Sequence, residues 1–177
     1  MDTRQIVITG GPGTGKSSII RELKERGYTC FEEISRQITL EARKEGVEQL
    51  FLTDPLLFSE RLLEGRIQQH REAKTHDSSL VFLDRGIPDV LAYMEYSGDD
   101  YPDHFEETAM LHNYDHVFIL APWEEIYVGD NVRYESFDQA IKIHEALLET
   151  YKRFGYSLLD VPFDSISNRA DFILNNI

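Results

Sequence analysis

The run Gln5-Ile6-Val7-Ile8-Thr9, followed at once by Gly10-Gly11-Pro12-Gly13-Thr14-Gly15-Lys16-Ser17, decides how this chain folds. The first part predicts a buried strand, and the second has glycines where a backbone bends to point several N–H groups inward. In this spacing the lysine contacts the β and γ phosphates of a nucleoside triphosphate, and the serine hydroxyl binds Mg²⁺. A glycine-rich turn with a solvated lysine is the alternative, but the position between a strand and a helix is the one that phosphate binding requires. The predicted ATP site comprises Gly11, Pro12, Gly13, Thr14, Gly15, Lys16, Ser17 and Ser18, with Lys16 catalytic and Ser17 a metal ligand.

Strands alternate with helices outward from this loop to the end of the chain. The run Leu80-Val81-Phe82-Leu83 is continuously apolar, as in a strand buried on both faces of a parallel sheet. The alternation predicts a single domain over residues 1–177 with a five-stranded parallel sheet, a three-layer α/β/α sandwich. Periodicity does not give the strand order. The expected strands cover residues 5–9, 28–31, 79–84, 116–120 and about 157–161.

The helices are indicated by their ends and by apolar spacing. Asp54-Pro55 combines a capping carboxylate with a proline preset for a first turn, and Gly27 suits a helix end. Apolar residues three and four apart from Phe137 to Phe154 predict a long helix whose apolar face includes His144, expected to be a hydrogen-bonded core residue. The expected helices cover about 15–26, a stretch from 34, 54–71, 137–154 and 168–175.

Composition excludes several classes of function. The 177 residues include 18 basic and 32 acidic side chains, a net charge of -14, which disfavours a nucleic-acid backbone or an anionic membrane surface as partner. A single cysteine gives no intramolecular disulfide and fits a reducing compartment. No apolar run approaches the roughly 20 residues that span a bilayer, so the cytoplasm is the expected location.

Asp84 and Arg85 follow the predicted third strand. A carboxylate at the end of a buried strand needs a metal, water or cation, so Asp84 is a candidate Mg²⁺ ligand or acceptor-orienting catalytic residue. A helix cap or surface turn is the alternative. Hydrolytic motor ATPases usually present a water-polarising glutamate next, whereas Arg85 is a cation suited to binding the acceptor.

Glu33 and Arg36 lie one helical turn apart after the second strand. If the second strand ends beside the phosphate loop, Glu33 is a candidate general base on an acceptor hydroxyl, with Arg36 beside it in the substrate site. The alternative is an ordinary surface pair on a helix. Arg61 and Arg66, on the helix from Pro55, are expected at the surface by default, although both could reach an acceptor.

The segment 121–135 is long enough to form a short lid. Arg133 is its sole cation and is expected to stabilise the charge on the transferred phosphoryl group; a pair with Asp130 or Glu135 is the alternative. Trp123 fits either stacking on a substrate ring or apolar packing.

Nearly the whole chain resembles a family, the small P-loop ATPases grouped around bacterial nicotinamide riboside kinase. The resemblance rests on the phosphate loop and on six further motifs. It implies a P-loop kinase-like fold, Mg-ATP as donor, Arg133 in a lid and an adenine pocket near Pro162 and Phe163. The further motifs are Glu33-x-x-Arg36, Asp84-Arg85, Arg133-Tyr134-Glu135-Ser136, Gly155-Tyr156, Val161-Pro162 and Arg169-x-x-Phe172-Ile173-Leu174.

Three functions are compatible with these residues. The favoured one is a kinase that transfers the γ-phosphoryl group of Mg-ATP to a nucleoside-like or other small-molecule acceptor, using Lys16, Asp84, Arg133 and Glu33 as catalytic residues. The second is a regulatory nucleotide-binding ATPase with slow hydrolysis and no acceptor. A motor-like ATPase is disfavoured by Arg85 and by the short chain. The acceptor and the oligomeric state do not follow from the sequence.

Overall fold

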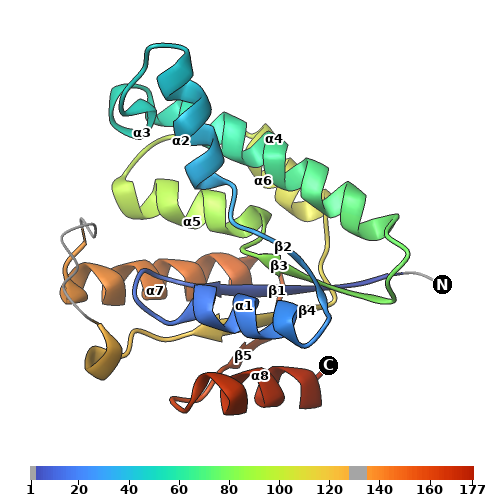
Figure 1. Cartoon of the computed structure of the whole chain (residues 1–177). Helices are drawn as coiled ribbons and strands as arrows, with labels where there is room; N and C mark the ends of the chain where they lie inside the picture. Colours follow the sequence, from blue (N-terminus) through green and yellow to red (C-terminus); the bar gives the residue numbers. More distant parts are fainter. Residues whose placement is uncertain (1–2, 128–134) are drawn as a thin grey trace.

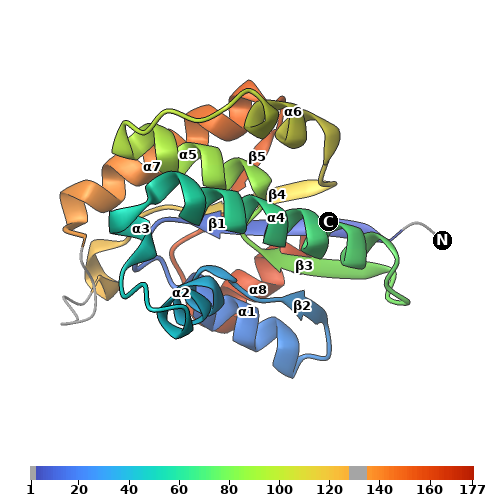
Figure 2. The same cartoon turned by 90° about the horizontal axis from the view of Figure 1, so that it is seen from above.

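The computed structural model describes residues 3–127 and 135–177. Its sheet has five parallel strands in the order β2-β3-β1-β4-β5, with β2 and β5 on opposite edges (Figure 2). The predicted five-stranded parallel sheet is therefore confirmed, and each strand lies within two residues of its expected bounds. The strands are β1 (Arg4–Gly10), β2 (Thr29–Phe31), β3 (Leu80–Asp84), β4 (His116–Leu120) and β5 (Leu158–Asp160).

The central strand β1 brings the phosphate loop and the acidic end of β3 to one edge of the sheet. Ile6, Val7 and Ile8 have no exposed surface, because helices cover both faces of this strand. In the parallel register Ile8 lies opposite Asp84, and Gly10 lies opposite Leu120. Side chains that follow β1, β3 and β4 therefore meet at the carboxyl edge, where ligands bind in open α/β sheets.

Helices form the two outer layers of the sandwich (Figure 1). On one face, α1 and α8 pack against apolar residues of β1, β3 and β4. On the other face lie α4, α5 and α7, and α6 packs on α4 and α5. The helices are α1 (Lys16–Glu25), α2 (Ser35–Lys44), α3 (Leu50–Thr53), α4 (Pro55–Lys74), α5 (Ile87–Ser97), α6 (His104–Leu111), α7 (Phe137–Arg153) and α8 (Ile166–Asn175), with a 3₁₀ turn η1 (Glu124–Ile126).

The predicted helix ends are confirmed where capping chemistry marks them. The Asp54 carboxylate accepts a hydrogen bond from the Leu57 amide at 3.0 Å, with Pro55 in the first turn of α4. Gly27 follows α1 with φ of 90°, and Gly155 follows α7 with φ of 84°.

Helix α5 was not predicted, because it lacks the polar face that would give its apolar residues a helical spacing. Seven of its eleven residues are buried, since α5 packs against α4, α6 and α7 as well as the sheet. Helix α3 is a single turn of four residues and is too short to show periodicity. Both helices contribute to the site described below.

The lid predicted over residues 121–135 is described only in part. Residues 121–127 include η1, and residues 135 and 136 lead into α7. Arg133 lies outside the described residues, so its predicted role is addressed below as a proposal. Across the described part of the chain, none of the helices combines the length and apolarity needed to cross a membrane.

Candidate functional site: a phosphate loop joined to an acid–arginine network

The phosphate loop connects the end of β1 to the start of α1. Gly15 adopts a left-handed conformation with φ of 85° at the helix N-cap, which a residue with a side chain adopts only at a cost. A Cβ there would also lie 2.7 Å from Nη1 of Arg169. The first turn of α1 carries no acidic residue, so its free amides and positive dipole end can bind an anion.

Lys16 forms a buried ion pair with Asp84. Its ammonium donates a hydrogen bond to Oδ1 of Asp84, and both side chains are almost fully buried. Burial and the nearby Arg85 guanidinium lower the pKa of Lys16, while Asp84 opposes this shift. The structure thus brings together the two residues that the sequence predicted for phosphate and metal binding.

Ser17 lies exposed at the start of α1, directly after Lys16, and Ser18 is partly buried. Thr14 is buried, and its hydroxyl donates to the Gly11 carbonyl at 3.1 Å, which closes the loop on itself. No cluster of three or more His, Cys, Asp or Glu suited to a metal occurs among the described residues. Mg²⁺ usually takes only one or two protein ligands beside water and phosphate oxygens, so a Ser17 hydroxyl and an Asp84 carboxylate fit this ion.

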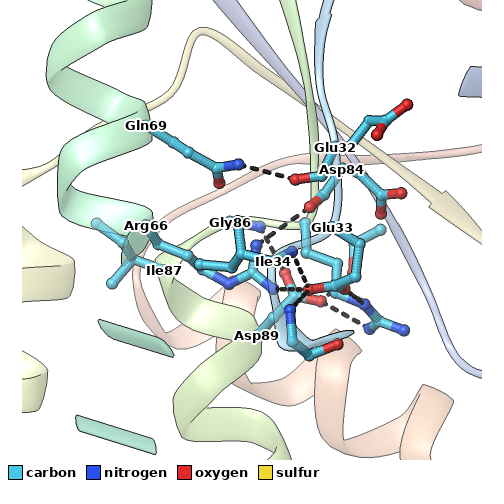
Figure 3. A network of polar contacts seen from close by, with 12 residues as sticks. Glu32, Glu33, Ile34, Arg66, Gln69, Asp84, Gly86, Ile87 and Asp89 are labelled. Carbon is cyan, nitrogen blue, oxygen red and sulfur yellow. Dashed lines mark hydrogen bonds and ion pairs between the residues drawn. The ribbon is translucent and has the colours of Figure 1, made fainter. Parts of the chain in front are cut away.

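Glu33 is the centre of the acid–arginine network, which consists of Glu33, Arg66, Arg85 and Asp89. Its carboxylate accepts hydrogen bonds from Nη2 of Arg66 at 2.8 Å and pairs with Nε of Arg85 at 2.5 Å. The backbone amides of Ile34 and Ser35 also donate to it, at 2.9 and 3.1 Å. Figure 3 shows Arg66 reaching from α4 to both Glu33 and the main chain of Asp84.

Asp89 holds the other side of Arg85. Its carboxylate is 2% exposed and accepts hydrogen bonds from Thr9 at 2.6 Å, from Tyr151 at 2.5 Å and from Nη1 of Arg85 at 3.2 Å. These donors come from β1, from α7 and from the end of β3. Asp89 therefore links the strand before the phosphate loop to the network.

The environment of Glu33 favours its ionised form. Burial would raise the pKa of this carboxyl group, but Arg66, Arg85 and Lys16 lower it to about 2. A carboxylate with so low a pKa is a weak proton acceptor in the ligand-free protein. It can still accept a hydrogen bond from a substrate hydroxyl.

The sequence expectation about Arg66 is wrong. Arg66 was expected at the surface, but it is 3% exposed and donates from Nη1 to the Asp84 carbonyl at 3.1 Å. Arg36, predicted to lie in the substrate site, is exposed and forms no ion pair with any described residue, so its role in substrate binding stays a prediction. Buried residues recur every three or four positions along α4, and this spacing could have placed Arg66 on the buried face. The residues with this spacing are Ser59, Leu63, Arg66, His70 and Ala73.

Asp89 and His144 also differ from expectation. Asp89 was missed because no helix was predicted over residues 87–97. His144 was expected to be a hydrogen-bonded core residue, yet it is only partly buried and its Nδ1 lacks a partner in the part of the chain that the structure describes.

A cavity of about 530 Å³ connects the phosphate loop to this network. Lys16 and Ser17 line it at the loop, together with all four residues of the network. Glu135, at the end of the predicted lid segment, lines it as well. The remaining wall is largely apolar and aromatic and comes from α3, α4 and α5: Phe51, Phe58, Leu62, Val90, Tyr93 and Tyr96.

A second group of aromatic residues lies near the other side of the phosphate loop. Trp123 stacks on Phe163 with ring centres 5.0 Å apart and an angle of 16° between the planes. Pro162 and Phe163, predicted near the adenine pocket, are both exposed. The Arg169 guanidinium lies 5.6 Å from the centre of the Trp123 ring.

Solved structures with the same architecture include nucleoside and nucleotide kinases. A deoxyadenosine kinase from M. mycoides with dCMP and dCDP bound superposes with a TM-score of 0.68 and 18% identity, covering 97% of each chain. Thymidylate kinase from Candida albicans gives 0.67 and 18%, covering 98% of this chain and 90% of its own. NadR in complex with NR gives 0.74 and 16%, and this chain spans 51% of the NadR chain. At these identities the likeness establishes the fold.

The sequence comparisons agree with this architecture. No curated protein matches the chain. The profile of the AAA domain family, however, matches residues 5–169, which include the phosphate loop, the acid–arginine network and Trp123. This chain is therefore a member of the AAA domain family, with the fold of the P-loop nucleoside and nucleotide kinases.

Proposed function

We propose that this protein is a kinase that transfers the γ-phosphoryl group of Mg-ATP to a hydroxyl group of a nucleoside-like small molecule. The observation that carries the proposal is the shared cavity: Lys16 and Ser17 of the phosphate loop line the same space as Glu33 and Arg85. A donor and an acceptor bound there would have their reacting groups side by side, which is the main requirement of phosphoryl transfer.

The charges in the cavity support a neutral acceptor group. Arg66 and Arg85 are paired with Glu33 and Asp89, so two guanidinium groups meet two carboxylates. An acceptor phosphate would have to compete with these carboxylates for the arginines, whereas a hydroxyl can donate directly to Glu33. The aromatic wall formed by Phe51, Phe58 and Tyr93 suits a flat ring attached to that hydroxyl-bearing group.

In the proposed reaction the acceptor oxygen attacks the γ-phosphorus of ATP. A new oxygen–phosphorus bond forms as the bond between the γ-phosphorus and the β,γ-bridging oxygen breaks, and ADP leaves. The acceptor loses its hydroxyl proton, which passes to Glu33 late in the step and then to solvent. A late transfer is compatible with the low pKa of Glu33, because the oxygen becomes strongly acidic only as the new bond forms.

The other residues position charge around this step. Lys16 would neutralise the β and γ phosphates, and Ser17 and Asp84 are the residues that would hold Mg²⁺, which would supply further charge neutralisation. Arg85, fixed by Asp89, directs its guanidinium towards the acceptor side. Arg133 contributes a cation from the lid; its support is the sequence motif alone.

The proposal is tested by incubating the protein with Mg-ATP and a pool of nucleosides, vitamins and sugars. Mass spectrometry should find one acceptor class that gains the mass of a single phosphoryl group. K16M, which removes the phosphate-binding cation, is the negative variant, and K24M on the exposed face of α1 is its matched control. If Mg-ATP binds but no compound in the pool is phosphorylated, the slow regulatory ATPase becomes the better description.

A further inference from the structure

Arg169 is a buried cation directly behind the phosphate loop. It lies in the first turn of α8, is 2% exposed, and donates from Nη1 to the Thr14 carbonyl at 2.9 Å. The same nitrogen lies so close to Gly15 that a side chain at Gly15 would collide with it. The guanidinium therefore sets the outer boundary of the loop that receives the phosphates.

This guanidinium has no counter-ion among the residues that the structure describes. Its Nε and Nη2 atoms are buried without a hydrogen-bond partner, and no described carboxylate forms an ion pair with it. The face of Trp123 gives partial compensation through a cation–π contact. Burial lowers the pKa of Arg169, with no acidic neighbour to oppose the shift.

The lack of a partner contrasts with the acidic composition of the chain. Asp171 lies on the same helix two residues away, but it pairs with Arg26 at 2.5 Å instead. Lys16 and Arg66, the other buried cations that the structure describes, each contact a carboxylate, as does the partly buried Arg85. A buried charge without a partner is costly, so its presence beside a phosphate loop points to a charge that arrives with the ligand.

We propose that Arg169 is the counter-charge for the polyphosphate of the donor nucleotide. It acts as a positioning residue: it fixes the loop through Thr14 and raises the positive potential beneath the phosphates, without touching the reacting atoms. Its ligand class is inorganic and nucleoside di- and triphosphates. The inference rests on the nucleotide-binding half of the proposed function and is independent of phosphoryl transfer.

The competing explanation is a purely structural role in which Arg169 holds α8 against the loop. The two explanations differ in what they require of the side chain. The structural role needs the shape of Arg169 and its bond to Thr14, whereas the counter-charge role needs the positive charge. R169K keeps the charge and changes the shape, and R169M keeps an apolar stem of similar length without the charge.

The test measures binding of three ligands by calorimetry in the presence of Mg²⁺: inorganic triphosphate, ATP and adenosine. We expect R169M to weaken inorganic triphosphate and ATP by the same factor, about tenfold or more, because both present the same charge to the loop. R169K should lose clearly less affinity than R169M for both, because it keeps the positive charge. Adenosine binding should not change in either variant.

Trp123 supplies a built-in reporter. It is the single tryptophan of the chain and lies against Arg169, so its fluorescence follows the surroundings of the guanidinium. Inorganic triphosphate should change this fluorescence in the natural protein and leave it unchanged in R169M.

Unchanged triphosphate binding in R169M would overturn the inference, as would an equal loss in R169K and R169M. If R169M does not fold, R169Q, which is neutral and can still donate to Thr14, takes its place in the same comparison. All of these measurements concern binding. A protein that binds triphosphate through Arg169 yet phosphorylates no acceptor would contradict the kinase and support the counter-charge.

Discussion

The arginines on the two sides of the phosphate loop differ in whether a carboxylate neutralises them. On the acceptor side, Arg66 and Arg85 are neutralised by Glu33 and Asp89 within the protein. Behind the loop, the buried Arg169 contacts the Thr14 carbonyl and the face of Trp123, and it forms no ion pair with the described part of the chain. A cation that is paired within the protein needs no counter-charge from a ligand. An unpaired buried cation gains its counter-charge only when an anionic ligand binds. The difference fits a site that binds a neutral acceptor group on one side and a highly charged donor on the other.

The largest effect on turnover is expected for the Lys16–Asp84 pair, which lies between the two sides. K16M removes the cation that we propose contacts the transferred phosphate, so turnover should fall on the order of a thousandfold and Mg-ATP should no longer protect against thermal unfolding. Initial rates and ligand-dependent melting temperatures measure the two effects. K24M, whose lysine pairs with exposed Glu32, should change neither; a fully active K16M would remove the phosphate loop from the mechanism.

On the acceptor side, E33Q tests the carboxylate that we propose orients the acceptor hydroxyl. The amide can still accept a hydrogen bond but cannot take up a proton, so turnover should fall about a hundredfold. The dissociation constant of Mg-ATP, measured by calorimetry, should stay the same. Normal turnover in E33Q would show that the acceptor loses its proton by another route.

The same variant probes the electrostatics of the network through pH. The pKa of Glu33 lies near 2 in the folded protein, below its ordinary value of 4.5, so the carboxylate stabilises the fold fully above about pH 4.5. This contribution is lost as the pH falls from about 4.5 to 2. The gap in unfolding free energy between the natural protein and E33Q should therefore shrink over that range in urea titrations. A constant gap would mean that Glu33 has no shifted pKa.

A smaller effect, on stability rather than chemistry, is expected for R66M. Removing this guanidinium leaves Glu33 with one arginine fewer in a buried setting, which should lower the free energy of unfolding by about 2 kcal/mol. R61M, on the same helix with an exposed partner, should change it by less than about 0.5 kcal/mol. Equal losses in the two variants would show that the pairing in the network contributes nothing.

The smallest effect is expected for D89N, which leaves the proposed catalytic residues Lys16, Asp84 and Glu33 in place. Asp89 fixes Arg85 from behind, so the variant should lower kcat/KM for the acceptor by about tenfold and leave Mg-ATP binding unchanged. D103N, at an exposed position before α6, is the control. A loss of nucleotide affinity in D89N would place Asp89 with the donor instead.

Local sequence patterns were sufficient for the parts of this fold that local forces determine. The strands appear as apolar runs because helices cover both sheet faces, and α4 begins where Asp54 and Pro55 satisfy its first turn. The strand order is set by packing between distant segments, which no local pattern records. Helix α5 was missed for the same reason, since burial on several sides removes the polar positions that create a period.

The candidate site was predictable only where a motif carries the chemistry. Gly10 to Ser17, Asp84, Arg85 and Glu33 gather at one edge because they follow parallel strands, as their positions in the sequence indicated. Arg66 and Asp89 belong to no motif and reach the site from helices, and an arginine is usually expected in solvent. The pairing of Glu33 with Arg66 in place of Arg36 depends on where α4 lies across the sheet, which is a tertiary property.

Arg85 has a positive φ of 73°, the only such residue other than glycine among the described residues. A side chain in this conformation costs on the order of 1 kcal/mol, and the ion pairs of Arg85 with Glu33 and Asp89 offset that cost. A glycine at this position would relieve the strain but would leave the two carboxylates with one cation fewer. The strained turn is therefore stable only while the guanidinium is held from both sides.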